Sequence, residues 1–414
     1  MLVLEEVKLD NGLRIYLVND NNKHTTYINL IINFGGLDNK VIVDNKKYNI
    51  KNGTAHFLEH LVLESSEYGD LMKLFGVNGV GSNGFTSIDR TQFYIDCVDN
   101  IYNNLGILLT GLHSPIINDD ILNKVRGPIL EEKKRSLDNK CSSLYNSTLN
   151  SIIDTKGFKS VLGDLEDISS INSKDIEIAF KSFYRPDNEI IIVGGRFDKE
   201  KILDVIKEAY NDIKFDNRIV IKDNIIHRNA VKKTKIVVKE DTNLERSVIS
   251  FKLNTLDLKP YDKLMLDTYL YYVLKNNFGI TSNLNTKLVN ENIIIGNMDY
   301  SCNLIEGYHV IRVEADTKNM SLFNDIIVDY FKNKKFVFDL EYFDLFKKNY
   351  IIDLITRSDD IYKTIDPLIE NIVFFKYNGI DSIDDILNID FLKYKNIVMD
   401  LDFNNYVVAM LRKK

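Results

Sequence analysis

An order of predicted elements that occurs twice along the chain constrains the fold more than any other feature of the sequence. In the first half, alternating apolar and polar residues predict strands near 3–7, 13–18 and 27–34. Helical patterns follow, among them about 54–75 and 142–154, and the apolar run EIIIV at 189–193 returns as a last strand. Strands followed by helices, with a final strand rejoining the sheet, are typical of an α+β domain.

The same order is found again in the second half of the chain. Strands are predicted at 246–253 and 293–301, long helices at 260–277 and 318–332, and a closing strand at 406–410. The residues themselves do not repeat, so the correspondence is one of elements only. We therefore predict an α+β fold of two homologous domains, each a mostly antiparallel sheet packed with helices.

The length of the chain agrees with this division. A chain of 414 residues is too long for one ordinary core and suits two domains of about 150 to 200 residues each. The residues 213–234 show no sustained period and are interpreted as a linker. The expected bounds are 1–212 for the first domain, which carries the metal motif described below, and 235–414 for the second, which lacks it.

Composition and charge exclude several classes of function. The formal net charge is −7, whereas a protein that binds the nucleic-acid backbone presents a basic face. No apolar run reaches the ~20 residues of a membrane helix. The first residues carry acids where a secretory signal has a basic segment followed by an apolar one. We expect a cytoplasmic protein that binds neither nucleic acid nor membrane.

The three cysteines do not form a recognisable site. Cys97, Cys141 and Cys302 are widely spaced and include no C-x-x-C pair, so neither a disulfide framework nor a thiolate metal site is indicated. Cys97 alternates with Phe93 and Ile95 in a predicted strand, and we expect it to be a buried core thiol.

The run HFLEH at 56–60 carries the main chemical signal. On a helix, His56 and His60 lie one turn apart on the same side, with Glu59 beside them. A catalytic zinc site needs such neutral imidazoles, one further protein ligand and an open position for water, from which Glu59 would take a proton. The H-x-x-E-H pattern is the inverted form of a zinc-protease motif. The alternative is a histidine pair that is simply packed in an apolar helix.

The residues around this motif favour the metal site. Leu61, Val62 and Leu63 continue an apolar helix, so the motif is expected on a buried element. Burying two histidines and a glutamate without a shared role would cost several kcal/mol in desolvation. By contrast, the glycine-rich run GVNGVGSNG at 76–84 lacks the Gly-Lys-Ser/Thr ending of a phosphate loop and precedes a strand, so phosphate binding is not expected there.

Three stretches together resemble a known family. NGTAHFLEH, GSNGFTSIDRTQFYIDC and RGPILEEKKRSLD look like the pitrilysin and insulinase family of zinc peptidases, the inverzincins, which include the mitochondrial processing peptidase. The likeness is strong over about 1–212 and faint beyond. It is nearest to the short bacterial members, whose single chain holds two homologous domains and which often work in pairs. The resemblance implies a zinc endopeptidase that cleaves extended peptides.

The resemblance also implies a third metal ligand on a later helix. The family's pattern falls on the Glu131–Glu132 pair and favours Glu132, with Glu131 as the alternative. Two nearby residues are unusual: one departs from the family's pattern, and the other is rarely found inside a helix. Val125 stands where the family often has a supporting glutamate, and Pro128 lies within the expected ligand helix, where it removes one backbone hydrogen bond.

A short strand is the implied substrate-binding element. In the family, the edge strand corresponding to Asn83, Gly84, Phe85 and Thr86 pairs with an extended peptide by β-augmentation. Small residues let the two backbones approach one another. The alternative is a flexible loop that leads into a strand.

The same resemblance implies that the second half lacks two residues needed for catalysis. Active members carry there an arginine and a tyrosine that hold the scissile carbonyl. Here those positions fall near Asn292 and Gly296, while Lys287 and Tyr300 are out of register. The resemblance therefore implies a heterodimer with a homologous subunit that carries the Arg/Tyr pair.

The sequence is also compatible with two other functions. A non-catalytic structural subunit descended from such peptidases is the main alternative, although an intact HxxEH motif argues against it. A zinc-binding regulator would need a fourth protein ligand, and the sequence offers none. The other histidines have no ligand spacing and are expected on the surface or in the core; they are His24, His113, His227 and His309.

Overall fold

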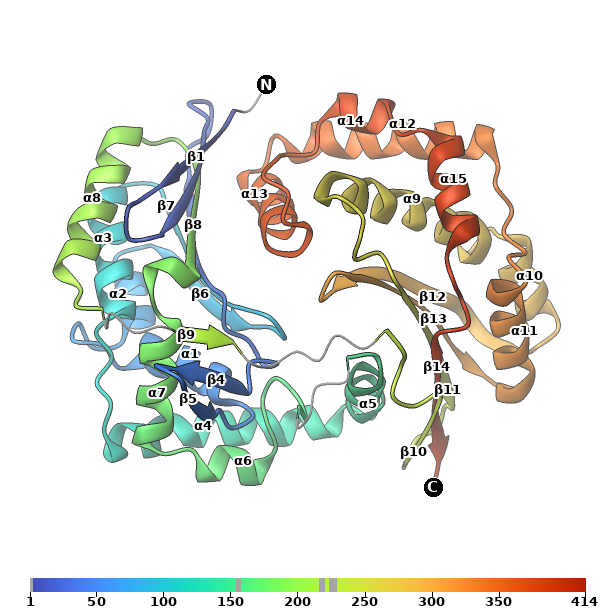
Figure 1. Ribbon diagram of the computed structural model, residues 1–414, viewed down its shortest axis with the longest axis horizontal. Helices are drawn as coiled ribbons and strands as arrows, with labels where there is room; N and C mark the ends of the chain where they lie inside the picture. Colours follow the sequence, from blue (N-terminus) through green and yellow to red (C-terminus); the bar gives the residue numbers. More distant parts are fainter. Residues whose placement is uncertain (1–2, 154–157, 216–219, 223–228) are drawn as a thin grey trace. The chain divides into compact units, whose positions relative to one another are not determined.

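The computed structural model describes residues 3–153, 158–215, 220–222 and 229–414 (Figure 1). The chain divides into two compact units. The first unit consists of Met1–Ser136 with Thr155–Ile225, and the second of Leu137–Asp154 with Ile226–Lys414. Each unit combines one main sheet with helices, so the predicted α+β class is confirmed.

The main sheet of the first unit has six strands among the described residues. Their order is β1 (Leu4–Lys8), β2 (Arg14–Asn19), β8 (Glu189–Gly195), β3 (Thr26–Ile32), β7 (Thr91–Cys97) and β6 (Gly81–Thr86). Only β2 and β8 run parallel; the other neighbours are antiparallel. All residues of β3 and β8 are buried, as expected for central strands, and β6 forms one edge.

Helices and a small second sheet complete the first unit. The sheet pairs β4 (Lys40–Val43) with β5 (Lys46–Asn49) and with β9 (Val220–Lys222). Helices α3 and α8 pack against each other beside the main sheet (Figure 1), and α1 contacts β6 and β7. The helices are α1 (Thr54–Glu64), α2 (Leu71–Val77), α3 (Ile101–Leu112), α4 (Asp119–Asp138), α6 (Leu165–Ser170), α7 (Ser173–Phe183) and α8 (Lys199–Asp212), with a 3-10 turn at Pro186–Asn188.

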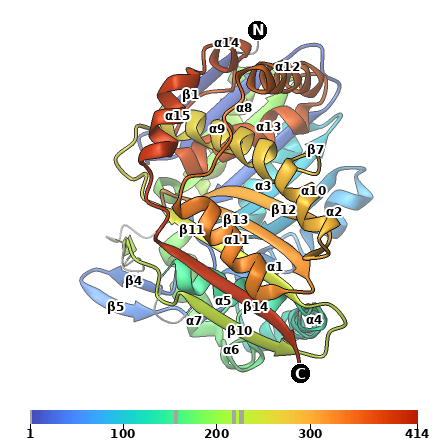
Figure 2. The same ribbon diagram turned by 90° about the vertical axis from the view of Figure 1, so that its right-hand side faces the viewer.

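The second unit has a five-stranded sheet among the described residues. The order is β10 (Lys235–Glu240), β14 (Tyr406–Lys413), β11 (Arg246–Leu253), β13 (Tyr308–Thr317) and β12 (Ile294–Ile305). Figure 2 shows α10 and α11 in front of these strands. The helices are α5 (Ser142–Ile152), α9 (Pro260–Phe278), α10 (Asn283–Asn290), α11 (Met320–Lys332), α12 (Leu340–Arg357), α13 (Ile361–Glu370), α14 (Ile383–Leu387) and α15 (Phe391–Asp400), with a π-helical turn at Asn371–Phe375.

Five neighbouring strands of the first main sheet, β2 to β6 in sheet order, have the same arrangement as the five strands of the second main sheet. In each main sheet, one strand runs parallel to the strand of that sheet that comes last along the chain: β2 to β8, and β10 to β14. The next three neighbours are antiparallel in both sheets, β8-β3-β7-β6 and β14-β11-β13-β12. The repeated element order of the sequence therefore corresponds to a repeated sheet topology, in which β12 occupies the edge position that β6 has in the first unit.

Three features differ from the elements predicted along the sequence. Helix α5, expected inside 1–212, packs against β10 and β14 of the second unit. Part of the expected linker 213–234 forms β9 and pairs with β4 of the first unit. The helix predicted from about 54 to 75 is two helices, because the chain turns at Gly69 (φ +82°) and Asp70 then caps α2. Within the described residues, none of the helices could span a membrane.

Candidate metal centre

Helix α1 presents the HFLEH motif from within the core of the first unit. Gly53 precedes it with φ +83°, and a side chain at this position would run into the backbone at Leu162. Nine of the eleven residues of α1 are buried, and His60 and Glu64 are the partly exposed ones. The packing of these buried residues therefore fixes the position of α1 and the direction in which its two histidines point.

Two histidines of α1 and one glutamate of α4 converge on a small volume. His56 Nε2 lies 3.4 Å from Glu132 Oε2, and His60 Nε2 lies 3.6 Å from the same oxygen. One donor atom from each of the three residues lies within 4.8 Å of the others, and in the described part of the chain this is the one group that could hold a metal ion. Two imidazole nitrogens and one carboxylate oxygen form a donor set that suits zinc and leaves a fourth position open.

The structure distinguishes between the two candidate glutamates of α4. Glu131 points away from the histidines: its side chain is 66% exposed and Oε1 accepts a hydrogen bond from Lys134 Nζ at 2.6 Å. Glu132 is one residue further around the helix and faces them. Pro128, which was expected to disturb the ligand helix, lies inside α4, and the helix continues past it to Asp138. Val125, which stands where the family often has a glutamate, is buried in the core of the first unit.

The two histidines differ in the direction of their pKa shifts, and only the shift of His56 favours the neutral form that binds a metal. Burial, together with the neighbouring imidazole of His60, lowers the pKa of His56 to about 3, so His56 is neutral near pH 7. Burial alone would also lower the pKa of His60. Its hydrogen bond to Glu64 and the nearby carboxylates of Glu59, Glu64 and Glu132 outweigh burial and raise that pKa. His56 Nδ1 is buried and finds no hydrogen-bond partner among the described residues.

Glu59 lies beside the histidines and is held by a residue of β6. Its side chain is almost completely buried, and Oε2 lies 3.9 Å from His56 Nε2. Thr86 Oγ1 donates a hydrogen bond to this oxygen at 3.0 Å. Burial raises the pKa of Glu59, while His60 and the hydrogen bond from Thr86 oppose that shift. A carboxylate with a raised pKa is suited to accept and release a proton near neutral pH.

Strand β6 has one face toward Glu59 and one face toward solvent. Asn83 and Phe85 are exposed, whereas Gly84 and Thr86 point to the opposite side. A methyl group at Gly84 would come within 2.9 Å of Leu63 and 3.2 Å of Glu59 Oε1, so glycine allows this close approach. Because β6 ends the sheet, its outer edge has no strand partner in the described part of the chain.

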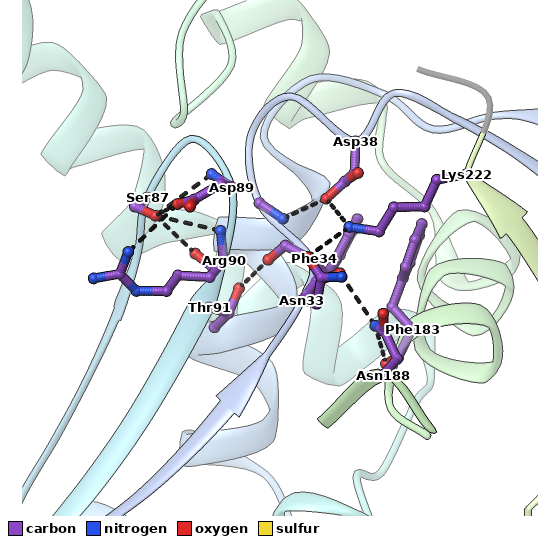
Figure 3. A network of polar contacts seen from close by, with 11 residues as sticks. Asn33, Phe34, Asp38, Ser87, Asp89, Arg90, Thr91, Phe183, Asn188 and Lys222 are labelled. Carbon is purple, nitrogen blue, oxygen red and sulfur yellow. Dashed lines mark hydrogen bonds and ion pairs between the residues drawn. The ribbon is translucent and has the colours of Figure 1, made fainter. Parts of the chain in front are cut away.

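A polar network braces the turn that follows β6 (Figure 3). Ser87 Oγ donates to Asp89 and accepts a hydrogen bond from the backbone nitrogen of Arg90. Asp38 Oδ2 accepts from the backbone nitrogen of Gly35 at 2.8 Å and from Lys222 Nζ at 3.0 Å. The loop after β3 is joined to this turn by backbone hydrogen bonds from Gly36 to the carbonyl of Ser87 and from Leu37 to the carbonyl of Ile88. The turn that follows Thr86 is thereby held in place.

The second unit lacks a cation and a phenol at the two positions singled out in the sequence. Asn292 adopts φ +55° just before β12, and Gly296 lies in an open, bulged part of that strand. The Lys287 side chain is 64% exposed near Glu291, and Tyr300 lies in β12 with its ring near Tyr271.

The other histidines that the structure describes, and Cys97, lie on the surface or in the core, as expected. His113 is buried, with Nε2 2.9 Å from Glu189 and Nδ1 2.7 Å from the carbonyl of Leu109. His309 is fully buried beside Thr255, His24 is exposed, and His227 lies outside the described residues. Cys97 is a buried free thiol, as predicted.

Sequence reasoning missed one residue of the centre. Glu64 Oε1 lies 3.0 Å from His60 Nδ1. Its spacing from His60, four residues along the same helix, was a signal that could have identified it.

Two family models match the chain. The model described as "Insulinase (Peptidase family M16)" matches residues 14–151, and "Peptidase M16 inactive domain" matches residues 170–350. The chain is 26% identical over 244 residues to the zinc protease YmfH of Bacillus subtilis, covering 58% of this chain and 56% of that protein. It is 27% identical over 274 residues to the zinc protease PqqE of Helicobacter pylori, covering 64% of this chain and 59% of that protein. The matches thus span little more than half of these relatives.

Solved structures share the complete fold at lower identity. An M16-like peptidase from Alicyclobacillus acidocaldarius superposes with a TM-score of 0.85 and 19% identity, covering 100% of this chain and 99% of the other. A protease from Helicobacter pylori gives a TM-score of 0.81 and 19% identity, with both chains fully covered. The folds of both units are therefore found in known structures.

Proposed function

The chain belongs to the insulinase (M16) family of peptidases, in its short two-domain form, and on this basis we propose that it is the zinc-bearing subunit of an endopeptidase that cleaves extended peptides. One observation carries the proposal: His56 Nε2, His60 Nε2 and Glu132 Oε2 converge, with the carboxylate of Glu59 beside them. The cytoplasmic location stays a prediction.

The proposed chemistry is hydrolysis by an activated water. Zinc, when bound by His56, His60 and Glu132, supplies a Lewis acid that lowers the pKa of a coordinated water toward ~7. Glu59 accepts the proton of the attacking water and then delivers it to the leaving amine. Burial raises the pKa of Glu59, which favours proton uptake by the carboxylate, and the hydrogen bond from Thr86 holds the carboxylate in one orientation.

The proposed peptide site is the free edge of β6. An extended peptide would add to this edge by main-chain hydrogen bonds, with Asn83, Gly84, Phe85 and Thr86 opposite it. Support comes from the position of the strand: Gly84 lies against Glu59, so a peptide on this edge passes close to the general base. Main-chain recognition of this kind does not select a sequence by itself.

The proposed assembly is a heterodimer with a homologous subunit. Asn292 and Gly296 can supply neither the cation nor the phenol that would stabilise a developing oxyanion. A partner with arginine and tyrosine at these positions would provide both groups. The alternative, a non-catalytic structural subunit, rests on the same observation and predicts no cleavage with any partner.

The proposal is tested by replacing Glu59 with glutamine in the chain purified alone and in the chain co-expressed with such a partner. Zinc content is measured by mass spectrometry and cleavage with a peptide library. We expect one zinc per chain in wild type and Glu59→Gln, with cleavage by the pair reduced ~10²–10⁴-fold in the variant. The exposed Glu67→Gln is the matched control. Undiminished cleavage by Glu59→Gln would contradict the mechanism, and an inactive wild-type pair would favour the structural alternative.

A further inference from the structure

The two histidines of the metal centre differ in how their second ring nitrogen is held. His60 Nδ1 lies 3.0 Å from Glu64 Oε1, while Nε2 of the same ring faces Glu132. The His60 ring is thus placed between two carboxylates, one at each nitrogen. His56 Nδ1, in contrast, is buried without a partner among the described residues.

The difference follows from the surroundings of the two rings. The His56 side chain is 8% exposed, so packing in the core restricts its rotation. The His60 side chain is 23% exposed, so packing restricts its rotation less. A hydrogen bond at Nδ1 is the remaining way to fix the orientation of an imidazole at a partly open position.

The placement of Glu64 is not explained by the stability of helix α1. Glu64 is the last residue of α1, where the partial negative charge of the helix end disfavours a carboxylate. The last turn of α1 contains no basic residue. In the described part of the chain, the ion pairs of Glu64 involve His60 alone, and the Glu64 side chain is partly shielded, at 31% exposure.

We propose that Glu64 is a positioning residue for the metal centre. Its carboxylate accepts the Nδ1–H of His60, which selects the tautomer in which Nε2 carries a free lone pair and directs that lone pair toward Glu132 and the metal position. Such a partner also makes the imidazole a more basic ligand. This inference rests on the proposed zinc function and assigns to Glu64 a role that the HxxEH pattern does not include.

The test measures zinc affinity by competition with a chromophoric chelator for wild type, Glu64→Ala, Glu64→Gln and the control Glu67→Gln. We expect Glu64→Ala to bind zinc ~10–100-fold more weakly. Glu64→Gln keeps an oxygen that can accept the Nδ1–H, so its loss should be smaller. Glu67→Gln removes the same charge from an exposed loop three residues away and should stay within about twofold of wild type.

A second readout separates positioning from general destabilisation. Cobalt(II) bound in place of zinc has a visible spectrum that reports ligand geometry, and we expect a changed spectrum in Glu64→Ala and a nearly unchanged one in Glu64→Gln. The apo proteins should unfold at similar temperatures. Wild-type affinity and spectrum in Glu64→Ala would overturn the role of Glu64. Failure of the wild-type protein itself to bind zinc would instead overturn the proposed function.

Discussion

The neighbouring glutamates of α4 offer a matched pair of substitutions. Glu132→Gln removes the carboxylate that lies 3.4 Å from His56 and 3.6 Å from His60. Glu131→Gln makes the same chemical change one residue earlier, on a side chain that is 66% exposed and bonded to Lys134. The two variants have the same net charge and composition, so a difference in zinc binding between them reports position alone.

The size of the expected difference follows from the donor set. Glu132 is the only carboxylate among the three donors, and a glutamine amide is a much weaker zinc ligand. Loss of an outer-shell partner costs ~10–100-fold in metal affinity. Loss of a direct ligand should exceed that range, so we expect at least about a 100-fold weakening, or about 2.7 kcal/mol. Glu131→Gln should bind zinc as wild type does.

Chelator competition at fixed pH and ionic strength measures both affinities, and circular dichroism of the apo proteins shows that both variants fold. The ligand assignment would be refuted by the reverse pattern, in which Glu131→Gln loses zinc while Glu132→Gln retains it. Equal affinities in the two variants would refute it as well, because the geometry places only one of these side chains at the histidines.

Other expected outcomes concern the surroundings of the centre. Thr86→Val should retain zinc and lower kcat by about tenfold or more, measured by steady-state kinetics, because a hydrogen bond to a charged group contributes ~1.5–3 kcal/mol; an unchanged kcat would argue against a role of Thr86 in holding Glu59. Gly84→Ala should also retain zinc but cleave more slowly, since the added methyl reaches Glu59; an unimpaired rate would exclude this close approach. Burial lowers the pKa of His113, but the contacts with Glu189 outweigh burial and raise that pKa overall. The His113–Glu189 pair therefore stabilises the fold fully below about pH 6.5, and its contribution declines as the pH rises through the raised pKa. The unfolding free energy lost in His113→Gln should therefore be larger at pH 5.5 than at pH 8.5, and a larger loss at pH 8.5 would contradict this sign.

Periodicity was sufficient to predict the repeated element order, because buried strands such as β3 and β8 and the amphipathic helices carry strong local patterns. It could not assign α5 to a unit. That assignment depends on long-range contacts such as the hydrogen bond from Tyr145 to Glu314 and the one from Lys252 to the carbonyl of Ile152. Neither contact leaves a local signature in the sequence.

The part of the candidate metal centre that lies on helix α1 could be predicted from the sequence. His56, Glu59 and His60 follow from helical spacing, whereas Glu132 required the family resemblance, since spacing alone does not distinguish it from Glu131. The contacts on which the proposed roles of Thr86 and Glu64 rest were found in the structure. Thr86 reaches Glu59 from another element, and the pairing of Glu64 with His60 becomes meaningful only once Nε2 of His60 is seen to face Glu132.

The most direct test of the account is the location of the metal in crystals of the zinc-loaded protein, determined from anomalous diffraction on both sides of the zinc absorption edge. We predict a single strong peak about 2.0–2.2 Å from His56 Nε2, His60 Nε2 and a carboxylate oxygen of Glu132, which are ordinary zinc–ligand distances. A peak bound by other residues, or no peak at this position in protein that contains one zinc per chain, would contradict the account.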